Sequence, residues 1–160
     1  MDQQSEQAQD VAALTLTAKS RRAHSLREVQ AWGRALGNLD AFLREFLDQF
    51  YVCTDPAQRQ AMLDDEPALG ENVQANAYLA AVAEHLALRY GLVVPDWTNG
   101  SARFLQSQWF PCGLKSLEAI LLEESPPAFR RRLIFVGEDP LYRPRRDAVG
   151  IGNHFGEQHE

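Results

Sequence analysis

The sequence has few of the residues that usually form metal centres or disulfide frameworks. Among its 160 residues there are only two cysteines, Cys53 and Cys112, and neither belongs to a CxxC pair. The four histidines show no HxxxH or HExxH spacing, which would place two imidazoles on one face of a helix. We therefore expect no metal and no cofactor, and we expect both cysteines to be small buried residues rather than a disulfide.

Long apolar runs are also lacking. No stretch approaches the roughly 20 apolar residues that span a bilayer. Residues 1–10 are polar and acidic and lack the basic-then-apolar order of a secretion signal. We therefore expect a cytoplasmic protein with no membrane partner. The net charge of −6 argues against non-specific DNA binding as its whole function.

Motifs of familiar enzymes are missing as well. There is no GxSxG, no glycine-rich phosphate loop after a strand, and no cysteine with a matching His/Asn set. The Arg-x4–6-His spacing of HEPN-type RNases is absent, and Gly100-Ser101 lacks the downstream Asp-x-Asp of small nucleotidyltransferases. Glu84 and His85 are consecutive and point about 100° apart on a helix, so they form no acid–base pair. We therefore predict a protein that is not an enzyme.

Helical periodicity dominates the remaining pattern. Ser25 and Glu28 have the spacing of a capping box, and Gly37 supplies a stop. The range 39–52 carries a single apolar stripe at helical spacing, formed by Leu39, Phe42, Leu43, Phe46, Leu47, Phe50 and Tyr51. The range 71–90 predicts a further helix, and six alanines between Ala75 and Ala87 leave room for a close neighbour.

Shorter helices complete the prediction. Asp55-Pro56 and Ser125-Pro126 each predict the start of a helix, with an N-cap residue followed by a proline at the first helical position. The range 114–124 predicts a helix that buries Leu117, Ile120 and Leu121. We therefore predict an all-α bundle of five to six helices with an aromatic-rich irregular connection over 97–110. The domain would span 25–137, between a polar leader (1–24) and a flexible Arg/Gly/Pro-rich tail (138–160).

Arginines cluster towards the C-terminus, and two interpretations stay open. The cluster comprises Arg130, Arg131, Arg132, Arg143, Arg145 and Arg146. Guanidinium groups suit planar contacts to phosphate or carboxylate, which would favour a nucleic acid or an acidic partner. The same residues also fit a solvated helix face and a basic tail. Three consecutive helical residues cover about 200°, so they cannot all face one ligand.

Several segments share a pattern with known proteins. They are Tyr78–Ala87, Tyr90–Leu92, Pro95–Trp97, Ala102–Leu105, Trp109–Phe110, Glu124–Arg132 and Phe135–Val136. Together, over about residues 40–137, they resemble a widespread family of small uncharacterised helical proteins of bacteria. The resemblance implies genes that stand beside one for a nucleotidyltransferase-like protein, as in toxin–antitoxin modules. The family's ending, SxNALxRA, is not matched, since Gly137-Glu138-Asp139-Pro140 stands there.

Two functional hypotheses follow. The first is a non-enzymatic protein-interaction module, antitoxin-like or accessory to a nucleotidyltransferase-type protein. It would present Trp97, Trp109, Phe110, Arg130, Arg131 and Arg132 to its partner, and it requires that some of these rings are incompletely buried. The alternative is a nucleic-acid-binding regulator that uses Arg143, Arg145 and Arg146.

Overall fold

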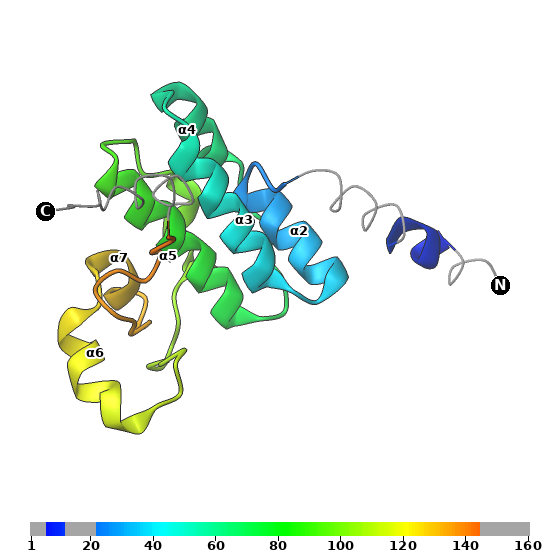
Figure 1. Cartoon of the computed structure of the whole chain (residues 1–160). Helices are drawn as coiled ribbons and strands as arrows, with labels where there is room; N and C mark the ends of the chain where they lie inside the picture. The colour runs from blue at the N-terminus through cyan, green and yellow to red at the C-terminus, as the bar shows by residue number, and fades with distance from the viewer. Residues whose placement is uncertain (1–5, 12–21, 145–160) are drawn as a thin grey trace, which may run out of the picture.

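The computed structural model describes residues 6–11 and 22–144, and within them the chain forms helices and no β-strand. This confirms the all-α prediction. The elements are α2 (Leu26–Leu36), α3 (Leu39–Val52), α4 (Pro56–Asp64), α5 (Val73–Arg89), the 3-10 turns η1 (Asp96–Asn99), η2 (Ser101–Arg103) and η3 (Lys115–Leu117), α6 (Glu118–Glu124) and α7 (Pro127–Arg130). A helical stretch at 6–11 lies apart from the body (Figure 1).

Local sequence signals set the limits of α2 and α3. The Ser25 hydroxyl accepts the N–H of Glu28, and the Glu28 carboxylate accepts the N–H of His24, so the capping box forms with its return bond one residue earlier. Gly37 ends α2 at φ 71°, a left-handed conformation that glycine adopts without steric cost. The helix over 39–52 forms within the predicted limits.

The α2–α3 pair supplies one half of the core. Phe46 and Phe50 of α3 are fully buried, and Trp32 of α2 meets Phe42 edge-on at 5.8 Å between ring centroids. Gly33 allows the two helices to approach closely, because a Cβ there would lie 2.7 Å from the Cα of Leu39. This half of the fold therefore depends on apolar rings and on one residue without a side chain.

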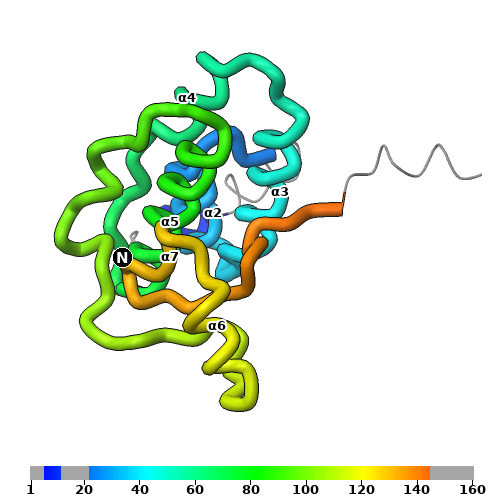
Figure 2. The backbone as a smooth tube through the Cα atoms, turned by 90° about the vertical axis from the view of Figure 1, so that its left-hand side faces the viewer, coloured from blue at the N-terminus to red at the C-terminus, as the bar shows by residue number. Residues whose placement is uncertain are grey.

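Helix α5 runs through the middle of the molecule (Figures 1 and 2). The residues from Leu79 to Glu84 are all buried, which is typical of a helix covered on all sides. Its neighbours are α4, α7, η1 and η2. The alanines of α5 let these short elements approach closely, as the sequence predicted.

The next segment, η3 with α6, projects from the body as an arm (Figure 2). Helix α6 packs chiefly against η3 and makes no comparable contact with α2–α5. Only Leu121 is buried, while Leu117 and Ile120 are 38% and 51% exposed. The prediction that all three face inward was therefore right for Leu121 and wrong for Leu117 and Ile120, because among the described residues no other helix packs closely against the arm.

The packed domain extends past both predicted boundaries. Ala23 is fully buried on the N-terminal side, and Leu141 belongs to the core on the C-terminal side. The Tyr51 hydroxyl donates to the carbonyl oxygen of Leu141 at 2.8 Å. Residues 138–144 therefore pack against the body rather than forming a free tail. The rest of the predicted leader and tail lies mostly outside the described residues.

Two smaller expectations also change. Helix α7 begins at Pro127 rather than Pro126, and the Ser125 hydroxyl donates to the Leu121 and Val136 carbonyl oxygens instead of capping it. Both cysteines are free, but Cys53 is only half-buried and Cys112 is exposed. Cys112 is exposed because it sits in a surface turn closed by the bond from Gly113 N–H to the Phe110 carbonyl.

Replacing Gly33 by alanine tests the close approach of α2 and α3. Alanine favours a helix by up to about 1 kcal/mol over glycine. The added Cβ meets backbone and must push α3 away, so we expect Gly33→Ala to lower the free energy of unfolding by about 1–3 kcal/mol in urea titrations. Gly137→Ala is the control, because nothing lies within 4 Å of its added Cβ. Equal effects in both variants would contradict the steric argument.

Candidate interaction surface

The three predicted aromatic residues are all half-buried, so none is completely enclosed. Trp97 lies on η1, where its indole N–H donates to the Leu63 carbonyl at 3.0 Å and the Arg103 guanidinium covers its ring at 4.8 Å. These contacts tie η1 to the end of α4. Trp97 therefore holds the fold together first, and only part of its ring remains open to a partner.

Trp109 and Phe110 fix the start of the arm. Trp109 forms an isolated parallel bridge with Ile134, through its N–H to the Leu133 carbonyl and its carbonyl to the Phe135 N–H. The Phe110 ring stacks on that of Phe135 with centroids 5.2 Å apart. Both side chains are half-buried. Residues 133–135, which follow α7, thus form the other side of this bridge.

The three consecutive arginines separate into different environments. Arg130 is exposed and donates to the Glu123 carbonyl. Arg131 is exposed but bonds the Glu84 carboxylate and Asn99, each at 3.0 Å. Arg132 is fully buried. The predicted surface of three arginines is therefore corrected: Arg132 cannot reach a partner in this conformation.

Arg132 forms a buried ion pair with Glu84 of α5. Its guanidinium also donates to the carbonyl oxygens of Ala128 and Thr98, at 2.7 and 2.8 Å, and lies 4.8 Å from the Phe104 ring centroid. Burial lowers the pKa of Arg132, and the bond and charge of Glu84 offset part of this effect. The Nε atom of Arg132 has no hydrogen-bond partner.

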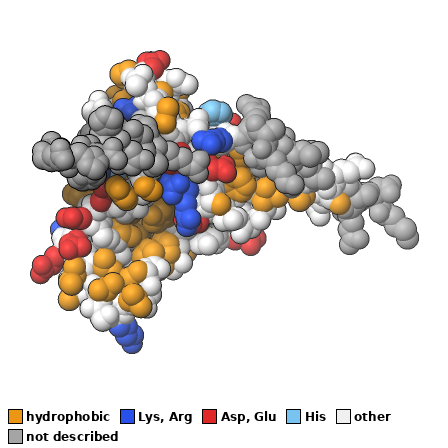
Figure 3. Space-filling view, viewed as in Figure 1, with side chains coloured by type: hydrophobic (Ala, Val, Ile, Leu, Met, Phe, Trp, Pro, Cys, Tyr) orange, Lys and Arg blue, Asp and Glu red, His pale blue; other side chains and the backbone are white. Residues whose placement is uncertain are grey.

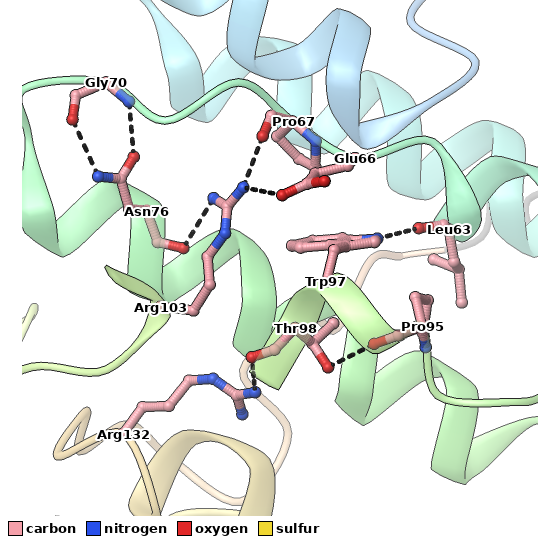
Figure 4. A network of polar contacts seen from close by, with 10 residues as sticks. All are labelled: Leu63, Glu66, Pro67, Gly70, Asn76, Pro95, Trp97, Thr98, Arg103 and Arg132. Atoms are coloured by element: carbon pink, nitrogen blue, oxygen red, sulfur yellow. Dashed lines mark hydrogen bonds and ion pairs between the residues drawn. The ribbon is translucent and has the colours of Figure 1, made fainter. Parts of the chain in front are cut away.

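A second buried arginine, Arg103, makes contacts of the same kinds on the other side of η1 (Figure 4). It donates to the Pro67 and Asn76 carbonyl oxygens and lies 3.6 Å from the Glu66 carboxylate. Desolvation lowers the pKa of Arg103, while Glu66 acts in the opposite direction. Periodicity and spacing do not point to Arg103, because most of its partners are backbone groups from distant parts of the chain.

The candidate nucleic-acid residues are only partly described. Arg143 makes a bidentate ion pair with Asp48 of α3, at 2.9 and 3.0 Å. This contact raises the pKa of Arg143. It therefore anchors residues 138–144 to α3. Arg145 and Arg146 lie outside the described residues.

Three shallow hollows surround the first turn of α5, with volumes of about 430, 350 and 280 Å³. The largest is lined by Gln30, Arg34 and Asn72 among others. No group of three or more His, Cys, Asp or Glu side chains in the described part of the chain is arranged to hold a metal ion. No helix among residues 6–11 and 22–144 combines the length and apolar composition of a membrane span.

The largest solvent-facing apolar feature of the arm is a stripe on η3 and α6. We define this apolar stripe as Leu114, Leu117 and Ile120, which are 55%, 38% and 51% exposed. Residues three apart nearly align along an α-helix, so Leu117 and Ile120 follow one side of the arm, and the exposed Leu114 directly precedes η3. Figure 3 shows hydrophobic side chains gathered over this arm and in the hollow between arm and body.

Comparison with known proteins identifies no relative: no family model, no curated protein and no solved structure matches the chain. The fold and its surface thus define an all-α protein with an exposed apolar arm. The resemblance to the bacterial family stays a prediction, together with the genomic neighbour that it implies.

Removing the buried guanidinium tests the internal role of Arg132. We expect Arg132→Met to lower the free energy of unfolding by about 3–5 kcal/mol, because Glu84 loses its buried partner. Arg130→Met is the matched control and should change it by less than about 1 kcal/mol, since Arg130 is exposed. Urea titration followed by circular dichroism measures both. Similar losses for the two variants would show that burial does not distinguish them.

His85 generates a prediction about pH. Its Nε2 is buried without a hydrogen-bond partner, and its ring meets Phe129 edge-on at 5.7 Å. Burial, followed by the charge of Arg89, lowers the pKa of His85, while Asp139 acts in the opposite direction. Below a pH of about 6.5 the unfolded chain therefore binds a proton that the folded protein resists, so stability falls as the pH is lowered.

The pH dependence is checked by urea titration between about pH 5 and 8, the interval in which histidine titrates. In His85→Leu the free energy of unfolding should fall less as the pH is lowered. In His24→Gln, where the replaced residue is exposed, it should fall as much as in the wild type. An unchanged slope in His85→Leu would refute the assignment of the proton to His85.

Proposed function

We propose that this protein is a non-enzymatic protein-interaction module whose arm, η3 with α6, contacts the partner. The observation that carries the proposal is the apolar stripe Leu114, Leu117 and Ile120. Single exposed leucines are ordinary on protein surfaces. An aligned row on a projecting element is different, because contiguous exposed apolar surface marks interaction sites.

The position of the stripe also supports the proposal that the arm contacts a partner. Leu121 and the hydrogen bond between Ser125 and Val136 hold α6 against the body, while the other large apolar residues of the arm stay exposed. Full burial of a leucine or isoleucine side chain is worth about 1.5–3 kcal/mol. A partner that covers the stripe gains this energy without rearranging the core of the protein.

An antitoxin-like or accessory role beside a nucleotidyltransferase-type protein is a finer form of this proposal, and it derives from the family resemblance alone. The alternative of a nucleic-acid-binding regulator has less support. Arg131, Arg132 and Arg143 use their guanidinium groups in ion pairs within the protein. That alternative therefore depends on Arg145 and Arg146.

The test compares capture of host proteins by stripe and control variants. Ile120→Glu places a charge in the stripe, and Val93→Glu places the same charge at a 74% exposed valine elsewhere. We expect tagged wild type and Val93→Glu to recover one protein in stoichiometric amount, resistant to nuclease, and Ile120→Glu to lose it. Identical recovery by both variants contradicts the assignment of the arm. Recovery that nuclease abolishes favours the nucleic-acid alternative.

A further inference from the structure

The charges around the apolar stripe restrict the chemistry of what covers it. The arm from Leu114 to Glu124 carries three glutamates, Glu118, Glu123 and Glu124, against the single cation Lys115. Glu123 and Glu124 are exposed, and they occupy the last turn of α6. The rim of the stripe is therefore acidic.

The two terminal glutamates are in a locally unfavourable place. A helix C-terminus carries partial negative charge and favours cations, yet the last turn of α6 holds no basic residue. The nearby Arg130 guanidinium bonds the backbone carbonyl of Glu123. No described ion pair engages the carboxylates of Glu123 or Glu124. Glu123 and Glu124 thus present two exposed carboxylates whose charge complements a cationic ligand.

A linear apolar stripe bordered by acids matches one kind of secondary structure. An amphipathic helix presents apolar residues at positions i, i+3, i+4 and i+7 along one face, and it packs lengthwise against a second helix. Basic residues flanking that face would lie beside Glu123 and Glu124, which are exposed. Complementary charge of this kind steers association and selects among partners.

We propose that the stripe Leu114, Leu117 and Ile120 binds a basic amphipathic helix of a partner protein, with Glu123 and Glu124 contacting its lysines or arginines. The proposal rests on the interaction function proposed above and names the class of partner. A second copy of this chain on the same stripe is the competing occupant.

The probe is a fluorescein-labelled peptide of about 18 residues, long enough to form a helix, with leucine on one face and lysine on the other. A peptide with glutamate in place of lysine is its counterpart. Fluorescence anisotropy with the full chain should show binding of the lysine peptide only, weakening as salt is raised. Equal binding of both peptides, or binding that salt does not affect, overturns the proposal.

Neutral substitutions test the apolar contact. Leu117→Ser with Ile120→Ser should weaken binding of the lysine peptide roughly tenfold or more, as expected for central interface residues. Leu88→Ser with Val93→Ser is the matched control at two other exposed apolar residues and should leave binding unchanged. Thermal unfolding of both pairs confirms that they remain folded. Binding that neither pair weakens means a general attraction to an acidic protein and overturns the proposal, as does equal weakening by both pairs.

A second pair of variants tests the rim. Glu123→Gln with Glu124→Gln should weaken binding and reduce its salt dependence. Glu71→Gln with Asp96→Asn removes the same charge from two other exposed positions and should have little effect. Equal effects of the two pairs would show that only net charge matters, against the proposal.

Sedimentation and host capture complete the test. A dimer that Leu117→Ser with Ile120→Ser dissociates would make a second copy the occupant and overturn the basic-helix assignment. If the stripe variant Ile120→Glu loses a host partner but the lysine peptide does not bind, the partner class is wrong and the interaction function stands. If neither assay separates stripe variants from controls, both fail.

Discussion

The second half of the fold depends on the contacts of one carboxylate. It belongs to Glu84, which is buried in the middle of α5. Alanines let short elements approach α5 closely, but each alanine buries little apolar surface. Polar anchors then have to position what covers the helix. The Glu84 carboxylate accepts hydrogen bonds from both Arg131 and Arg132. Arg132 in turn donates to the Thr98 carbonyl oxygen of η1. One carboxylate thus fixes α7 and η1 against the same face.

A buried ion pair of this kind fixes the relative positions of the segments that it joins more than it adds to the net stability of the fold. Desolvation of the two charges cancels much of their attraction, so an apolar pair of the same shape can be equally stable. The planar guanidinium adds something that an apolar side chain or a lysine lacks. It bonds carbonyls at its edge while its face covers an aromatic ring, as Arg132 does on Phe104 and Arg103 on Trp97. We infer that the irregular segment 95–105 keeps one conformation because these arginines specify it.

Sequence reasoning succeeded where the physics is local. The limits of α3, the Asp55–Pro56 start of α4 and the Gly37 stop follow from neighbouring residues and were predicted. The burial of Arg132 could not be predicted, because it depends on a carboxylate 48 positions away. Periodicity likewise identified an apolar stripe on α6 but not whether another helix lies opposite. The predicted aromatic residues are at least partly accessible, whereas Leu117 and Ile120, which periodicity predicts to face inward, are exposed.

The same contacts that hold α5 also hold the arm in place. Residues 133–136 follow directly on Arg132, and the arm is joined to them at both ends. Trp109 bridges Ile134 before the arm begins, and the Ser125 hydroxyl both donates to and accepts from Val136 where it ends. An element fixed at both ends has little backbone freedom left to lose on binding, which lowers the entropic cost of association. The buried Arg132, which directly precedes residues 133–136, thereby helps to set the orientation in which the stripe faces solvent.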